Sequence, residues 1–528
     1  MALPPPEVRR GVPFQNLVAG IGRVFRVHPN TLELDMKTKL FDSSTRCDKI
    51  AAFVSHSWGS PGYQKYFSLL IYEAGLPAMV AAMVAGLAML LGQKFGRKLP
   101  FMVVEGAFDP VFEVYQESQP WEFLCSFLVG ITVFVTYPLY GPVVREKLFF
   151  LDCMCIHQTD IEKKMAGIKG LGGFVLMSER LYIMWDQDYF SRLWCVYELA
   201  VYKALHPGKN NVDILPLRGS VAVLLLIPIF FAGFLLYIIL FPSVAQWGIY
   251  TFYAAAMAAS CVVFTGAAVA GYDFADQLVV LEKQLEEFEV RSAQCFAPED
   301  RAEILSKIEG MYEGDLDMFN HIVRNDLKNN VLGIIRCTPT QVLPYKTLMT
   351  GLIAVIGFQF FGIAWFRDSN SETFVSFTIY MITFAWAMMP LITSICMQHG
   401  EKLYLKHPPP TGEAGLKKAL QRNKWRYLKI GTTGAAAFIL LWTSLAFVAP
   451  LAAANSREGE PFLGLFGPAA ALPISVATCA PAFAAIWWSF RAPRKGKGKA
   501  QVEAGEEDAA GAAAGAAAGA GAEGGAGV

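Results

Sequence analysis

The feature that most constrains this chain is a set of long apolar runs. A helix needs roughly 17 to 25 mainly apolar residues to cross a hydrocarbon core about 30 Å thick. Eight runs reach that length and fall into four pairs: 76–92 with 122–140, 220–241 with 246–271, 345–366 with 374–397, and 430–454 with 462–490. The sequence therefore predicts a polytopic α-helical membrane domain of about eight transmembrane helices arranged as hairpins.

Composition agrees with this prediction. The chain is 54% hydrophobic and only 17% charged, with a mean hydropathy of +0.37. Its 45 basic residues balance its 45 acidic residues, so the overall charge gives no support to nucleic-acid binding. The N-terminal stretch lacks the basic segment followed by an apolar one that a cleaved signal peptide needs, so insertion is expected to use an internal run.

The distribution of basic residues predicts the orientation. The loop 398–429 and the segment "RAPRKGKGK" are strongly basic, whereas the short loop 242–245 has no basic residue and the other two short loops carry only Arg367 and Arg457. Basic loops stay on the cytosolic side. We therefore expect the long connections and both termini to be cytosolic, and none of the ten cysteines lies in a loop assigned to the far side, where disulfides would form.

The charged stretches between the hairpins include an interrupted α/β domain. Residues 48–58, 147–152, 179–186 and 211–217 are short apolar segments typical of buried strands, and 63–73 is typical of a helix. Strands alternating with helices predict a parallel sheet with its polar residues at the carboxyl edge. The domain would comprise 1–75 and 141–219, split by a transmembrane hairpin at 76–140 whose two ends lie close together and hold the domain against the bilayer.

The rest of the chain is divided in the same way. Residues 272–344 are expected to form a cytosolic helical subdomain, in which Leu278, Leu281, Leu285 and Phe288 make one apolar stripe. Packing of this stripe on its own domain is favoured over a coiled-coil contact, because the heptad pattern covers only about two repeats. Pro298 marks a helix start, and the Ala/Gly-rich tail 491–528 is expected to be disordered.

Three polar clusters fall at the ends of the predicted strands: "SHSW" at 55–58, "LDCMCIHQTD" at 151–160 and "DYFSRLWCVYELA" at 188–200. Their order and form resemble the Toll/interleukin receptor (TIR) family, most closely a branch known mainly from unicellular eukaryotes. The matching residues are Phe53, Ser55 and His56 in the first cluster, Phe150 and Asp152 in the second, and Ser191, Trp194, Cys195, Glu198 and Leu199 in the third. The resemblance covers about 125 residues, and the third motif is its most specific part. It departs from the family in the hairpin insertion and in "CMCIHQTD", which replaces a glycine-containing loop.

This resemblance implies a flavodoxin-like fold and, in members that cleave NAD, a catalytic glutamate at the position of Glu198. Cleavage of the glycosidic bond to nicotinamide builds positive charge on the ribose, which a nearby carboxylate stabilises. Trp58 or Trp194 would stack on a ring of NAD, Ser55 or His56 would hydrogen-bond a phosphate or ribose hydroxyl, and Asp152 would complete the binding site. The alternative is structural: Glu198 as a surface acid that offsets the helix dipole, and Trp194 as core.

The motifs also contain residue types that occur in metal sites and as reactive thiols. Cys153, Cys155, His157 and Asp160 include zinc-ligand types, but no second Cys/His pair completes a tetrahedral set, so no metal is expected. Cys195 is either a reactive thiol near a helix start or, more commonly, a buried inert one.

The membrane domain suggests a different class of function, because a chain of this kind could be a transporter. None of the eight runs carries a central charged residue or histidine, which are the usual marks of an ion path. Gly351, Gly357 and Gly362 suit close helix packing instead. The sequence thus predicts a membrane-anchored TIR-like signalling protein that oligomerises laterally and acts either as an NAD-cleaving enzyme or as a non-catalytic adaptor. A transport protein with a degenerate TIR-like domain is the alternative.

Overall fold

The computed structural model describes residues 3–26, 31–96, 99, 121–144, 147–206, 211–221, 224, 232, 249–295, 298–329, 389–409 and 413–454. The predicted spans 345–366 and 462–490, nearly all of 220–241, the first part of 374–397, the glycines at 351–362 and the tail 491–528 lie outside these residues.

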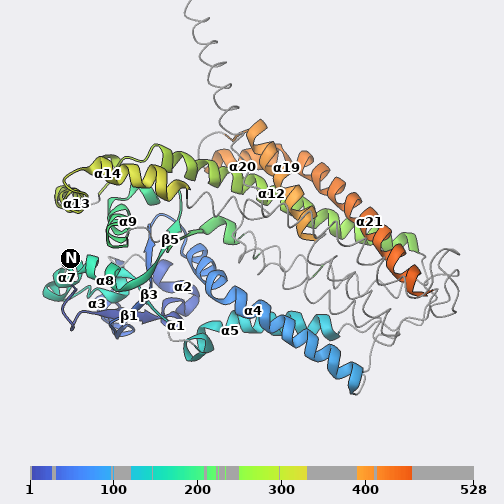
Figure 1. Ribbon diagram of the computed structural model, residues 1–528, viewed down its shortest axis with the longest axis horizontal. Coiled ribbons are helices and arrows are strands. Elements are labelled where there is room, and N and C mark those ends of the chain that lie inside the picture. The colour runs from blue at the N-terminus through green and yellow to red at the C-terminus, as the bar shows by residue number, and fades with distance from the viewer. Residues whose placement is uncertain are drawn as a thin grey trace, which may run out of the picture.

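A six-stranded sheet forms the centre of the N-terminal domain (Figure 1). Its order is β2-β1-β4-β3-β5-β6. The four predicted strands are present as β3 (Ile50–His56), β4 (Leu148–Phe150), β5 (Ser178–Trp185) and β6 (Val212–Pro216), and they pair in parallel. Phe53 pairs with Phe150 across β3 and β4, and their rings stack at 4.5 Å. The two strands on either side of the predicted hairpin are therefore direct neighbours.

The expected all-parallel sheet is wrong at one edge. Strand β1 (Arg10–Pro13) runs antiparallel to β4, and β2 (Thr45–Arg46) runs antiparallel to β1, so the sheet is mixed. Three short helices connect these strands: α1 (Phe14–Leu17), α2 (Ala19–Arg26) and α3 (Leu34–Asp42). Pro13 is the last residue of β1 and directly precedes α1. Strands this short carry too few residues for a period to be recognised in the sequence.

The helix after β3 does not stop at the predicted start of the hairpin. Helix α4 (Gly62–Phe95) runs for 34 residues, about 51 Å at the usual rise per residue, from the sheet edge through the whole first apolar run. Helix α5 (Trp121–Val144) returns antiparallel to it and leads into β4. The hairpin is closed at its base by Glu73 of α4, which accepts hydrogen bonds from Lys147 Nζ at 2.6 Å and from the Tyr182 hydroxyl at 2.8 Å.

The faces of the sheet are covered by further helices and by the C-terminal half of the chain. The connections contain α6 (Asp152–Cys155), α7 (Ile161–Lys169), α8 (Leu171–Met177), the 3-10 turn η2 (Tyr189–Ser191) and α9 (Leu193–Leu205). They are followed by η4 (Val290–Ser292), α13 (Pro298–Met311), α14 (Leu316–His321) and the π-helical segment η5 (Ile322–Leu327). Tyr312, directly after α13, donates to the Ala200 carbonyl oxygen at 2.7 Å, which fastens this helical group to α9.

Helix α12 (Ile249–Glu286) passes without a break through the predicted boundary at residue 272. Leu281, Leu285 and Phe288 are buried in the same core as the sheet, so this stripe packs on its own chain, as its short heptad pattern predicts. One helix thus joins the apolar bundle to the sheet domain.

Helices α19 (Met389–Lys406) and α21 (Lys424–Ala454) pack along α12, and the short α20 (Glu413–Arg422) precedes α21. The backbones are in direct contact where α12 and α19 cross. A Cβ atom on Gly400 would stand 2.0 Å from the Ala268 carbonyl oxygen, and one on Gly271 would stand 2.1 Å from that of Met397. Only glycine allows this approach.

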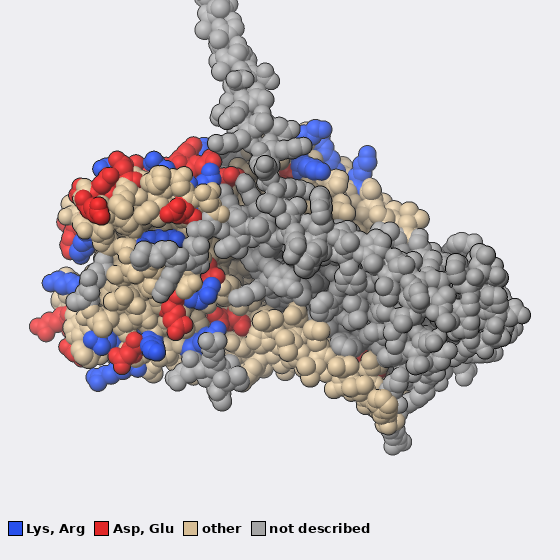
Figure 2. All heavy atoms as spheres, viewed as in Figure 1, with Lys and Arg blue, Asp and Glu red and all other residues tan. Residues whose placement is uncertain are grey.

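Three helical segments of the described chain are long and apolar enough to cross a membrane: Gly62–Gln93, Trp121–Tyr140 and Met257–Glu286. Helices α4, α5, α12 and α21 extend from the sheet domain toward the same side of the molecule (Figure 1). Charged side chains gather over the sheet domain and the adjoining helices, whereas the far parts of the described helices show almost none (Figure 2). Large apolar side chains such as Val84 and Leu139 point outward there, 61% and 71% exposed.

Candidate functional site at the carboxyl edge of the sheet

The polar clusters that follow the parallel strands meet at the carboxyl edge of the sheet, where α/β proteins place their sites. The ends of β3, β4 and β5 contribute side chains, and α4, η2 and α9 supply the others. We call this group the sheet-edge centre; its members are Ser55, His56, Ser57, Lys65, Asp152, Asp186, Tyr189 and Glu198. Most of these side chains are fully or largely buried, which is uncommon for polar residues.

Glu198 lies in the second turn of α9, and its carboxyl group is desolvated although part of the residue reaches the surface. Burial raises the pKa of Glu198 to about 8; a hydrogen bond with Ser55 partly offsets the rise, and the negative charge of Asp152 adds to it. The group is therefore mostly protonated at pH 7. An ordinary surface acid that offsets a helix dipole would remain solvated, so this environment differs from the one the structural alternative requires.

Ser55 connects Glu198 to a second hydroxyl group. The Ser55 Oγ and the Tyr189 hydroxyl are 2.7 Å apart, and both residues are almost completely buried. Desolvation holds the pKa of Tyr189 well above its usual value, so the phenol keeps its proton. When Glu198 is ionised, Ser55 can donate to the carboxylate while it accepts from Tyr189. This chain of hydroxyl groups would favour one orientation of the carboxylate.

The centre also contains a buried cation. Lys65, in the first turns of α4, has no exposed surface, and its Nζ donates to the Ser57 carbonyl oxygen at 2.6 Å. The Ser57 hydroxyl in turn donates to Asp186 Oδ2, and among the charged groups Asp186 acts most strongly on Lys65. Asp186 itself is only partly buried. A lysine is almost never fully buried unless it is paired, so this environment is unusual.

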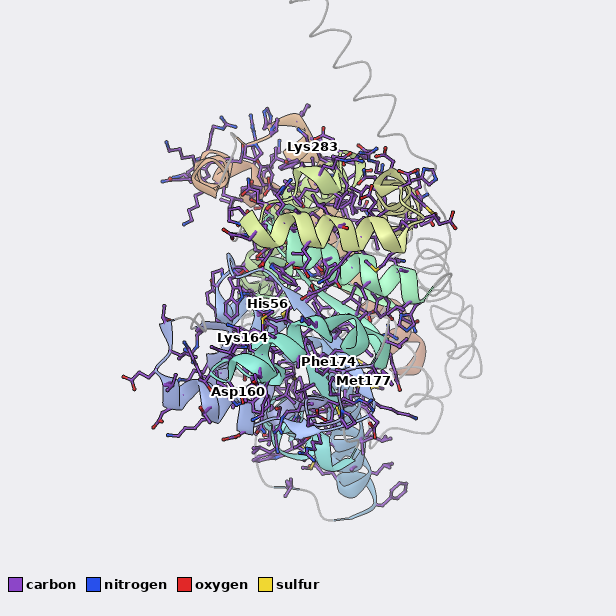
Figure 3. The ribbon with its side chains drawn as sticks, turned by 90° about the vertical axis from the view of Figure 1, so that its left-hand side faces the viewer. His56, Asp160, Lys164, Phe174, Met177 and Lys283 are labelled. Carbon is purple, nitrogen blue, oxygen red and sulfur yellow. The ribbon has the colours of Figure 1, made fainter. Side chains whose placement is uncertain are left out.

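His56 lies between the rings of Phe25 and Trp58, at centroid distances of 5.7 and 4.7 Å. Burial first, and the charge of Lys65 second, hold the pKa of His56 well below its usual value, so the imidazole is neutral at pH 7. His56 is only 8% exposed, and Figure 3 labels its position on the sheet domain together with those of Asp160 and Lys164. Its Nε2 is buried and has no hydrogen-bond partner within the described part of the chain.

Four of the six residues predicted from the sequence belong to the sheet-edge centre, and a fifth, Trp58, lies against it. Ser55 and Asp152 act directly on Glu198. His56 contacts Trp58, whose ring lies 5.5 Å from Lys65 Nζ. The exception is Trp194, which is half-buried and packs edge-on against Tyr197 at 6.0 Å.

Sequence reasoning missed four members of the centre: Ser57, Lys65, Asp186 and Tyr189. Asp186 could have been found, because it follows β5 in the way that Asp152 follows β4. Lys65 could not, since a lysine in the first turn of a helix is ordinarily solvated.

The neighbouring cysteines are poor candidates for chemistry. Burial raises the pKa of Cys155 to about 12 and those of Cys153 and Cys195 well above the usual value, so all three are protonated thiols. His157 packs on Phe41 at 4.5 Å, and its Nδ1 accepts from the Asp160 amide at 3.0 Å. No group of three potential metal ligands occurs among the described residues.

Comparison with known proteins gave no match: no protein-family model fits the sequence, and no curated protein or solved structure is significantly similar to it. The sheet-edge centre combines an acid that titrates near neutral pH, hydroxyl groups that orient this acid, a neutral imidazole and an aromatic ring. Such a set suits a ligand with hydroxyl groups and a planar ring, and a reaction that develops positive charge.

Proposed function

We propose that this protein is a membrane-anchored, TIR-like signalling protein that hydrolyses NAD at the sheet-edge centre, with Glu198 as the catalytic residue. The observation that carries the proposal is the environment of Glu198: a desolvated carboxyl at the carboxyl edge of a parallel sheet, bonded to Ser55 and close to Asp152. A group whose pKa is about 8 can exist in either protonation state near neutral pH.

The proposed reaction breaks the bond between the ribose C1′ and the nicotinamide nitrogen. The electron pair leaves with nicotinamide, water adds its oxygen to C1′, and one proton is released, so that NAD and water give nicotinamide and ADP-ribose. The ionised Glu198 carboxylate would stabilise the ribosyl cation between these steps. The positive nicotinamide ring of bound NAD favours that ionised form, because an opposite charge lowers the pKa of a carboxyl.

The strand order supports a flavodoxin-like, TIR-like classification of the domain. Numbered along the chain, the four parallel strands lie in the order 2-1-3-4, the beginning of the flavodoxin-like order. The motifs that resemble the TIR family fall at the ends of β3 and β4 and at the start of α9. Ser55, His56, Trp58 and Asp152 are the proposed NAD-binding residues, and Trp194 is the least supported of the predicted set.

We further propose about eight transmembrane helices, with both termini and the TIR-like domain in the cytosol. This placement is supported by the common direction of α4, α5, α12 and α21 and by the charged side chains at the sheet end (Figures 1 and 2). The helices would act as an anchor in which copies of the chain associate laterally, as TIR-like domains do when they signal.

The test is nicotinamide release by the full-length protein in bilayers. We expect Glu198→Gln to lower NAD turnover by roughly a hundredfold or more, because the amide keeps the size of the carboxyl but cannot carry its charge. Glu179→Gln is the matched control: Glu179 is an exposed acid on β5, and its replacement should leave turnover unchanged.

Two results would decide against the enzyme. If the wild-type protein at high density in bilayers releases no nicotinamide above the Glu198→Gln background, the adaptor function takes its place. If the protein releases no nicotinamide but carries a solute across the membrane of sealed vesicles, the transport alternative is favoured instead.

A further inference from the structure

A second charged region lies where α19 ends and α21 begins. This is the end of the helical bundle opposite to the far, apolar parts of the described helices. Residues 398–429 contain eight lysines and arginines but only two glutamates, in a chain whose formal net charge is zero. All eight basic side chains are exposed. We call this surface the basic corner; its members are Lys402, Lys406, Lys417, Lys418, Arg422, Lys424, Arg426 and Lys429. Blue side chains mark its position over α20 and the start of α21 in Figure 2.

The fold forces these charges outward. Ala419, Asn423 and Tyr427 are spaced four residues apart, and each is at most 2% exposed. Tyr427 packs edge-on against Tyr272 of α12 at 5.7 Å. Because this stripe faces the bundle, the basic residues between its members must project from the other faces of α20 and α21.

Several of the positive charges lie around His407. His407 follows the end of α19, and the Tyr272 hydroxyl donates to its carbonyl oxygen at 2.7 Å. The pKa of His407 lies below its usual value, through desolvation first and then through the positive charges of Arg426, Arg422 and Lys406. These cations come from the ends of three helices.

The described residues contain no ion pair that compensates the charges of α20 and α21. Arg426 Nη1 donates at 2.8 Å to Asn423 Oδ1, which carries no charge. Asn423 is itself fully buried beneath the corner. The corner thus offers unpaired cations and the N-terminus of the 31-residue helix α21. This is the chemistry that recognises phosphate.

Apolar side chains stand among the charges. Trp425 is 71% exposed and Leu405 is 62% exposed, and Lys424 Nζ lies 5.8 Å from the Trp425 ring. The apolar run of α21 begins at residue 430, and Leu440 is 69% exposed along it. Exposed tryptophan beside lysine and arginine, at the start of a helix long enough to span a bilayer, is typical of the headgroup region.

We propose that the basic corner binds the phosphate-bearing headgroups of anionic phospholipids in the cytosolic leaflet of the membrane that the protein crosses. The inference rests on the membrane placement proposed above and is independent of NAD cleavage. A soluble phosphate compound would use the same cations, but it would not account for the exposed Trp425 and Leu405, whereas a lipid covers both.

The test titrates fluorescent phosphatidylserine and phosphatidylcholine into the full-length protein in neutral detergent micelles. Phosphatidylserine should bind at least tenfold more tightly, and the difference should shrink as salt is raised. A fourfold variant should abolish the preference: Lys417→Gln, Lys418→Gln, Arg422→Gln and Arg426→Gln. A control variant with the same change in charge should keep it, because its four exposed lysines lie elsewhere: Lys39→Gln, Lys169→Gln, Lys283→Gln and Lys307→Gln.

Two results would overturn the proposal. One is equal affinity of the wild-type protein for both lipids. The other is displacement of phosphatidylserine by inorganic phosphate at equal concentration, which would assign the corner to a soluble anion. Nicotinamide release by the corner variant in neutral lipid should equal that of the wild-type protein, so failure of the lipid test and failure of the NAD test are distinguishable.

Discussion

The sheet-edge centre buries its ionisable groups, whereas the basic corner exposes them to solvent. In the centre, Lys65 is completely buried and the carboxyl of Glu198 is desolvated. In the corner, eight cations are exposed. Burial of an ionisable group costs folding free energy and shifts its pKa, whereas an exposed charge costs little and acts on its surroundings over a Debye length. The centre is therefore suited to chemistry on one ligand, and the corner to attraction of a charged surface.

The largest difference between the two regions should appear when one lysine of each is made apolar. We expect Lys65→Met to raise the free energy of unfolding by about 1–3 kcal/mol, because methionine fills a similar space without a buried ammonium and Asp186 can remain hydrated. Lys417→Met should change it by less than about 0.5 kcal/mol. Thermal unfolding of the full-length protein in one detergent measures both. A marked loss of stability in Lys65→Met would mean that the buried cation holds the fold together.

A smaller effect should appear in the pH dependence of the free energy of unfolding when Glu198 is replaced. The pKa of its carboxyl is about 8 in the folded protein, against 4.5 for an ordinary glutamate. The folded state therefore binds more protons between these values, and its stability falls as pH rises through that window. Glu198→Gln should become more stable than the wild-type protein, by about 1–2 kcal/mol near pH 9. In the control variant Glu179→Gln, the free energy of unfolding should depend on pH as it does in the wild-type protein. If Glu198→Gln also showed the wild-type pH dependence, the Glu198 carboxyl would be solvated.

The two regions also differ in how far the sequence could predict them. The four parallel strands were predictable because each is a short apolar segment bounded by polar residues, and the basic bias of 398–429 is visible in composition. Strands β1 and β2 were not, because four and two residues carry no period. The continuity of α4 was hidden because its composition changes from amphipathic to apolar near residue 76 while its backbone stays helical.

In the sheet-edge centre, only the residues that lie in motifs at strand ends or at a helix start could be predicted from the sequence. Ser55, Asp152 and Glu198 lie in motifs that follow the strands or open a helix. Tyr189 joins them through a contact across 134 residues of sequence, and Lys65 through a turn that brings the start of α4 back to Ser57. The desolvation that raises the pKa of Glu198 depends on packing from several elements, and no local pattern encodes it.

The central claim is that the desolvated Glu198 carboxyl cleaves NAD in its ionised form. The most direct test is the pH dependence of kcat/KM for nicotinamide release by the full-length protein in bilayers, since this quantity reports the ionisation of the free enzyme. With a pKa of about 8, kcat/KM should rise as pH increases and level off above about pH 8, and this rise should be absent in Glu198→Gln. At saturating NAD the rise should move to lower pH, because the nicotinamide cation favours the carboxylate. A rate that stays constant between about pH 6 and pH 9, or no nicotinamide at any pH, would contradict the account.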